Sequence, residues 1–411
     1  MKAVKIGAAC LLAASVPLSA QTLEERLEIA ESRLASLEQQ STVADRISVN
    51  GFIRFAMESQ NNIKDAAGND LAYRGSVVAD DWDNRRLTRA GVQFNARISD
   101  DAEAVVQLLS RGTDDFDVEA QWAYIGYNLR PDLKIRAGRI VLPFYFHSQY
   151  LNVGYAYPWV ELPTEIYGAI PVDTMEGLDA NWTFNTGDIN HNLNVYWGSM
   201  AVDVDGIVFD INHQRGANLR SSFGNFTTWL SYTSSEVTLD LSGDIPPAPP
   251  GTFAPYSLDR SYAHYTGAGL QYDNGALVMM GEWTELKIDS PDHWFPTQPA
   301  GYVMAGYRFG KLMPHVTWAF VDAQGFTSVT TPLGQALYSD YADRQKSWTL
   351  GARYELTTGI ALKAEASRYY DFGNDGVATQ GVFNGVDDTI ATGAPDNSHP
   401  LVFRLAVDAV F

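Results

Sequence analysis

The feature that most constrains the fold is a two-residue alternation of apolar and polar side chains that recurs from Ile47 to the C-terminus. In the stretch ISVNGFIRFAME, for example, Ile53 and Phe55 alternate with Arg54 and Glu58. This period is typical of a β-strand with one apolar and one polar face. The pattern predicts sixteen strands, over residues 47–58, 85–99, 102–111, 119–129, 133–142, 176–184, 190–199, 208–222, 225–236, 262–273, 276–288, 300–309, 311–322, 346–356, 360–371 and 400–411.

The connections between these segments alternate in length. One set is short and rich in turn residues, as at Asn274-Gly275 and Arg130-Pro131-Asp132. The other set is mostly long and covers residues 59–84, 112–118, 143–175, 200–207, 237–261, 289–299, 323–345 and 372–399. Such alternation places the long loops at one end of an up-and-down sheet, as in an outer-membrane barrel with short periplasmic turns. A soluble sandwich or propeller, the alternative all-β architecture, has no reason to sort loop length by end.

The two faces of the predicted strands have different chemistry. Apolar sets such as Val92, Phe94 and Ala96 would face lipid, where a charge is costly. The opposite faces are polar, as at Gln93 and Asn95, which predicts a wet interior. The predicted fold class is therefore all-β, a transmembrane up-and-down antiparallel β-barrel of about sixteen strands, preceded by a short N-terminal helix.

The N-terminus has the organisation of a secretory signal peptide. A basic start, an apolar run over residues 6–16 and a small-residue site at Ser19-Ala20 predict a signal peptide at residues 1–20. Its removal takes away Lys2, Lys5 and the single cysteine, Cys10, and leaves 27 basic against 49 acidic side chains, a net charge of −22. This composition excludes disulfides and thiolate zinc sites and argues against a nucleic-acid partner.

Residues 21–41 carry a heptad repeat. The apolar seam consists of Leu23, Leu27, Ala30, Leu34 and Leu37. Charged residues beside the seam favour a parallel oligomer. We expect a periplasmic coiled-coil helix at 21–41, a linker at 42–46 and the barrel at 47–411. A lone amphipathic helix resting on the barrel is the alternative.

The chain resembles the trimeric sixteen-strand porins of Gram-negative outer membranes over residues 47–411. The resemblance rests on the strand and turn rhythm, the LKIRAGR run at 133–139 before a long loop, and the terminal Phe411. The heptad segment is similar to the coiled coil of DcaP-like porins. The resemblance implies a homotrimer in outer-membrane lipid and lipopolysaccharide, periplasmic termini, and recognition of Phe411 by the outer-membrane assembly machinery. It also implies that the third loop, about 143–175, folds into the barrel.

The strand phase predicts a basic wall lining the pore. Its members are Arg54, Arg89, Arg97, Arg136, Arg308, Arg353, Lys363 and Arg404. The third loop contributes the acidic residues Glu161, Glu165, Asp173 and Glu176. A basic wall opposite an acidic loop edge predicts a transverse electric field across the constriction. Ordinary lumen charges paired with their neighbours are the alternative at each position.

The predicted function is a diffusion channel for small hydrophilic solutes and ions. A channel that prefers small organic anions or sugars is one alternative, and an enzyme barrel or a structural or adhesion barrel is another. The seven histidines are scattered, and neither an HExxH nor a G-x-S-x-G motif is present. We therefore expect no catalytic residues, no metal and no cofactor.

Overall fold

The computed structural model describes residues 46–61, 63–65, 67–73, 81–168, 170, 173–204, 207–243, 249–372, 381, 383–385 and 400–411. The predicted signal peptide and coiled coil, and all of the linker except Arg46, lie outside these residues. The chain divides into two units, Met1–Ser48 and Val49–Phe411.

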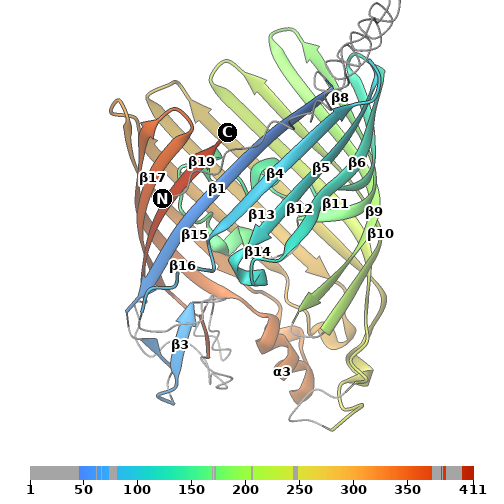
Figure 1. The fold of residues 1–411 in the computed structure, drawn as a ribbon. Coiled ribbons are helices and arrows are strands. Elements are labelled where there is room, and N and C mark those ends of the chain that lie inside the picture. Colours follow the sequence, from blue (N-terminus) through green and yellow to red (C-terminus); the bar gives the residue numbers. More distant parts are fainter. Residues whose placement is uncertain are drawn as a thin grey trace, which may run out of the picture. The chain divides into compact units, whose positions relative to one another are not determined.

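Sixteen antiparallel strands close into a barrel, which confirms the predicted fold class and strand number (Figure 1). The barrel strands are β1 (Ile47–Gln60), β4 (Arg89–Arg97), β5 (Ala102–Arg111), β6 (Val118–Arg130), β7 (Leu133–Val141), β8 (Thr174–Thr186), β9 (Ile189–Val204), β10 (Ile207–Phe223), β11 (Phe226–Leu239), β12 (Leu258–Asp273), β13 (Leu277–Ile288), β14 (Gln298–Tyr307), β15 (Leu312–Asp322), β16 (Arg344–Thr357), β17 (Ile360–Tyr370) and β19 (Leu401–Val410). The last strand pairs with the first, with Val410 opposite Phe52. Because all strands then have two partners, the sheet has no open edge.

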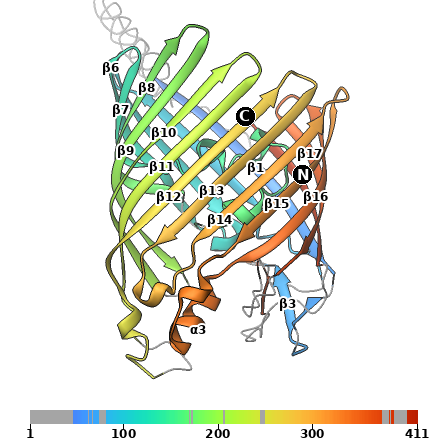
Figure 2. The same ribbon diagram turned by 180° about the vertical axis from the view of Figure 1, so that it is seen from behind.

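The short turns gather at one end of the barrel and the longer connections at the other (Figure 2). The predicted loop at 200–207 is the exception, because β9 extends to Val204 and β10 begins at Ile207. The alternation simply continues through this stretch: Val202 pairs with Phe209, and both side chains are buried. A loop was therefore wrongly predicted where the two strands extend.

The long loops contain structure that strand periodicity does not reveal. A small separate sheet joins the first and last of them, from β2 (Ile63–Lys64), β3 (Asp70–Tyr73) and β18 (Phe383–Gly385). The loop before β16 contains helix α3 (Pro332–Tyr341), whose first turn is capped by the Thr331 hydroxyl. None of the helices in the described part of the chain is long and apolar enough to cross a membrane.

The largest apolar core lies inside the barrel. Trp159 and Ile166, from the loop after β7, are buried against inward-facing residues such as Tyr302 and Met304 of β14. The outer face is apolar and exposed, as at Leu350, which is 66% exposed. Burial of aromatic surface therefore fixes the loop against the inner wall rather than holding two sheets together.

Candidate pore constriction

The connection between β7 and β8, residues 142–173, is the constriction loop. It contains three short helical turns: η2 (Ser148–Tyr150), η3 (Gly154–Ala156) and α2 (Thr164–Tyr167). The Trp159 indole donates to Thr317 of β15 at 2.8 Å, and the Phe146 amide donates to Glu282 of β13 at 2.9 Å. Because these strand residues point inward, the loop lies within the barrel.

A group of charged residues on β1, β17 and β19 holds one side of the loop. We call Arg54, Lys363, Glu365, Arg404 and Asp408 the anchor cluster. Lys363 donates to the carbonyl oxygens of Gly154, Tyr157 and Trp159 at 2.6, 2.6 and 2.9 Å.

Arg54 and Asp408 form the centre of the anchor cluster. The Arg54 side chain donates to Asp408 at 2.6 Å and to the Val160 carbonyl at 2.5 Å, and it is 1% exposed. Lys363 also contacts Asp408, at 2.9 Å. The loop backbone approaches this pair so closely at Gly154 that an added Cβ would lie 2.1 Å from Arg54 and 2.2 Å from Asp408. Only glycine fits at this position.

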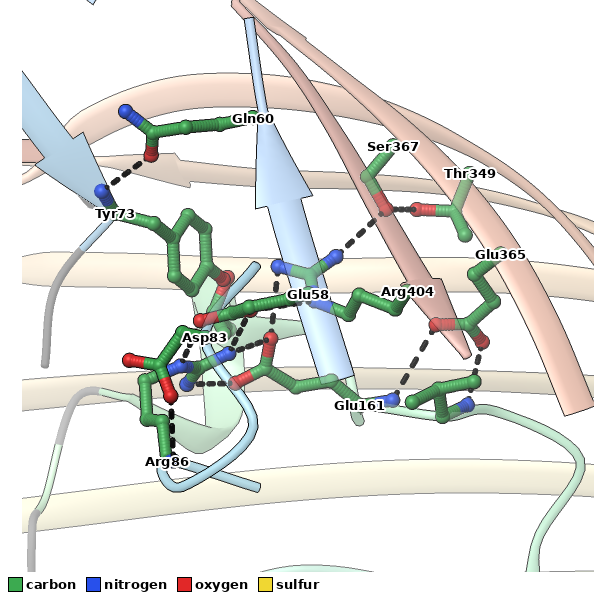
Figure 3. Close-up of polar contacts among 12 residues, drawn as sticks. Glu58, Gln60, Tyr73, Asp83, Arg86, Glu161, Thr349, Glu365, Ser367 and Arg404 are labelled. Carbon is green, nitrogen blue, oxygen red and sulfur yellow. Dashed lines mark hydrogen bonds and ion pairs between the residues drawn. The ribbon is translucent and has the colours of Figure 1, made fainter. Parts of the chain in front are cut away.

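Glu161 links the constriction loop to two other parts of the barrel (Figure 3). Its carboxylate contacts Arg86 of the first loop at 2.6 Å and Arg404 of β19 at 2.8 Å, and Arg86 also binds Glu58 of β1 at 2.5 Å. Burial opposes ionisation of Glu161, but the two guanidinium groups outweigh it and hold its pKa at about 2. Glu161 is therefore a bound counterion at neutral pH.

Glu365 of β17 binds loop backbone instead of a cation. It accepts from the amides of Val160 at 2.7 Å and Glu161 at 3.3 Å (Figure 3). A carboxylate that accepts two amides fixes the direction of the chain at this point.

The other three predicted acidic residues lie in different surroundings. Glu165 is buried and accepts from Gln345 at 3.1 Å, and its burial raises its pKa. Asp173 accepts from Gln121 at 2.5 Å and is partly exposed. Glu176 is part of β8 and not of the loop, and its side chain is 60% exposed on the outer face, which it shares with Leu178 and Trp182. Glu176 is thus not part of the constriction.

The predicted basic residues all lie on inward-facing positions, but the structure does not bring them together in one pore-lining wall. The Arg54, Lys363 and Arg404 side chains are at most 2% exposed beneath the loop. They stabilise the loop and do not line open space. The strand phase could not predict this difference, because it gives the direction of a side chain but not what covers it.

Three of the remaining basic residues have carboxylate partners on neighbouring inner positions. Arg136 donates to Asp179 at 2.9 Å, Arg308 to Asp273 at 2.6 Å and Arg353 to Glu355 at 3.0 Å. These contacts match the paired-charge alternative.

Arg89 and Arg97 of β4 complete the predicted set. Arg89 donates to the Asn152 amide oxygen at 3.0 Å, and its Nε atom is buried without a hydrogen-bond partner among the described residues. Arg97 is exposed near the short-turn end. Arg89 is thus an inward guanidinium in contact with the constriction loop.

Sequence reasoning missed Arg86. The predicted strand 85–99 includes it, whereas β4 begins only at Arg89 and the preceding residues form a turn. The Asp83 carboxylate accepts the backbone amides of Arg85 and Arg86 in this turn, at 2.7 and 3.2 Å. This Asp-initiated turn is a sequence signal that could have ended the strand earlier.

A closed barrel with an apolar outer face and a loop folded into its lumen is the architecture of an outer-membrane porin. The family model described as Gram-negative porin matches residues 7–375, so the chain belongs to the Gram-negative porin family. This membership places the protein in the bacterial outer membrane. A search of curated proteins finds no match.

Several solved structures are similar in fold. DcaP, an outer membrane channel of Acinetobacter baumannii, is 12% identical with a TM-score of 0.54, covering 89% of this chain and 97% of that one. An anion-selective porin from Comamonas acidovorans is 12% identical with a TM-score of 0.55, covering 89% and 99%. OmpT, an outer membrane protein of Vibrio cholerae, is 11% identical with a TM-score of 0.56, covering 89% and 97%. At this identity the likeness concerns the fold.

Proposed function

We propose that this porin is a diffusion channel for small hydrophilic solutes and ions, with its open path along β4–β8. The observation that carries the proposal is a series of partly exposed charged side chains on this side of the barrel. Their exposed fractions are 43% for Glu119, 21% for Arg111, 18% for Asp173, 12% for Arg136 and 36% for Lys134. The series starts next to the second loop and ends next to a short turn, so water reaches it along the length of the barrel.

The charges along this path alternate in sign. Arg111 lies between Glu119 and Asp173, which it approaches to 3.5 Å, and Arg136 is paired with Asp179. The sequence predicts a transverse field between the basic wall and the acidic loop. Because Glu161 and Arg404 are in direct contact, this proposal instead places local electric fields along β4–β8. Near the constriction, Arg89 has no carboxylate partner among the described residues. Its positive charge therefore favours a weak preference of the channel for anions.

In this proposal the short turns and both chain ends face the periplasm, and the protein is a trimer. The heptad at 21–41 and the trimeric porins that the chain resembles support this arrangement. An enzyme barrel or a structural barrel remains the alternative of another class, and neither is favoured by a specific observation.

Recordings in planar bilayers test the proposal. We expect stepwise openings in groups of three, and a reversal potential in a salt gradient that moves toward cation preference in Arg89→Gln. Arg139→Gln is the matched control, because this arginine lies on the outer face beside Glu176. A silent membrane with correctly folded protein would refute the channel. An equal shift in both variants would refute the role of Arg89.

A further inference from the structure

An open cavity of about 670 Å³ lies between the constriction loop and the inner faces of β1 and β4–β6. Strand residues that line it include Phe52, Gln93, Gln107 and Trp122, and the loop contributes Gln149 and Tyr155. It opens beside the short β16–β17 turn, where Gly359 is part of its lining. This volume is within the range of small-molecule binding sites.

Most polar side chains of the cavity are carboxamides, and Thr358 and Tyr155 add hydroxyl groups. None of the described side chains that line it is charged. Gln107 donates to Gln93 at 3.0 Å and Gln93 donates to Asn95 at 2.7 Å, so this row of amides is fixed in direction. Gln107 uses its amide nitrogen to bind Gln93, so the side-chain oxygen of Gln107 can still accept a hydrogen bond. Gln149, on the loop opposite, is exposed. A carboxamide offers a donor and an acceptor side by side, which matches neighbouring hydroxyl groups on a solute.

The apolar part of the cavity is aromatic and held in place. Tyr155 donates its hydroxyl to Glu355 and accepts from the Gly359 amide at 3.2 Å, while the Arg353 guanidinium lies 4.5 Å from its ring centroid. Phe52 lies over Gly91, where an added Cβ would come within 2.4 Å of the ring.

Trp122 completes the aromatic set, opposite Gln107 in the β5–β6 ladder. The negative face of an aromatic ring attracts the polarised C–H bonds of a solute. Aromatic rings beside donor–acceptor amides therefore offer both kinds of contact that a sugar ring makes.

We propose that this cavity is a binding subsite for neutral polyhydroxylated solutes, that is, small sugars in transit. The lining offers two kinds of contact, hydrogen bonds from amides and C–H contacts to rings, and none of its described side chains is a counterion to a charged solute. The inference rests on the channel function proposed above and names a solute class for it.

Single-channel recordings with maltose, glucose and a polyethylene glycol of matched size test the subsite. We expect maltose to reduce the open current saturably and the polymer to reduce it only in proportion to its concentration. Trp122→Ala and Gln107→Ala should each raise the half-saturating maltose concentration about tenfold. Trp182→Ala, a tryptophan of the outer face at 38% exposure, should leave it unchanged.

The outcomes separate the subsite from the channel itself. Each variant must first form open channels, which report a folded pore. Normal conductance without saturable block by either sugar would overturn the subsite and leave the channel function intact. Saturable block by benzoate but not by sugars would also overturn it, in favour of an anion site. A loss of conductance in the wild-type protein would instead refute the channel.

Discussion

The two sides of the lumen differ in what their inward charges do. On the anchored wall, made by β1, β17 and β19, Lys363 and Arg54 are 0% and 1% exposed and bind the constriction loop. On the open wall, made by β4–β8, Lys134 and Glu103 are 36% and 33% exposed and bind each other at 2.8 Å. The same strand alternation directs both sets inward. The path of one loop decides which charges stabilise the protein and which meet the solute.

Replacement of Lys363 by Met should have the largest effect. It leaves three loop carbonyls without their donor and removes one cation from Asp408, and breaking a buried pair costs about 3 to 5 kcal/mol. We expect a loss of unfolding free energy of this size, measured by denaturant unfolding in lipid vesicles, and increased open-channel noise. Lys134→Met, on the open wall, should cost less than about 1 kcal/mol. Equal losses would contradict the division into two walls.

Acid should break the contacts of Glu161 with the two arginines only at low pH. Because the pKa of Glu161 in the fold is about 2, below its ordinary value of 4.5, its stabilisation is fully present above about pH 4.5 and is lost as the pH falls toward 2. The shift corresponds to about 3 kcal/mol. Channel noise measured from pH 6 to pH 2.5 should show a rise below pH 4.5. Glu161→Gln should lack this rise, and a rise that persists unchanged in the variant would contradict the assignment.

Glu365→Gln should loosen the loop locally. An amide keeps one acceptor oxygen for the Val160 and Glu161 amides, so the change costs about 1 kcal/mol. We expect faster hydrogen exchange at these two amides and a loss of global unfolding free energy of no more than about 1 kcal/mol. Glu103→Gln, on the open wall, is the control and should leave both exchange rates unaltered. Protection at Val160 that is insensitive to Glu365 would show that aromatic packing alone holds the loop.

Salt should have the smallest effect, and it should act on one wall only. Raising the ionic strength from 0.1 M to 1 M shortens the screening length from about 10 Å to about 3 Å. We expect ion selectivity, which depends on the open wall, to decline, while exchange at Val160 stays constant. If both change together, the anchor cluster is reached by solvent ions.

The barrel was predictable because each strand can be recognised from the alternation of apolar and polar residues within its own sequence. Two-residue alternation reports burial on one face, and the strand predicted at residues 208–222, for example, corresponds to β10 (Ile207–Phe223). The start of β4 was placed too early, at residue 85 instead of Arg89, because the turn signal at Asp83 was overlooked.

The site was less predictable, because its contacts join residues far apart in the sequence. Val160 binds Glu365 about two hundred positions away, and no local pattern encodes that pairing. The strand alternation predicts that the Arg54 and Lys363 side chains point into the barrel. It does not predict their burial, because the constriction loop that covers them comes from a distant part of the sequence. Glu176 shows the reverse case: it was counted with the acidic loop residues, but it belongs to β8 and lies on the outward face of that strand.

The close seat of Gly154 against Arg54 and Asp408 has a consequence for how the pore sorts solutes by size. The loop meets the wall there through its backbone, with no space for one methyl group. This contact fixes the distance of the loop from the anchored wall, and it therefore limits variation in the width of the open path along β4–β8. The largest solute that can pass along this path should therefore have a sharply defined size.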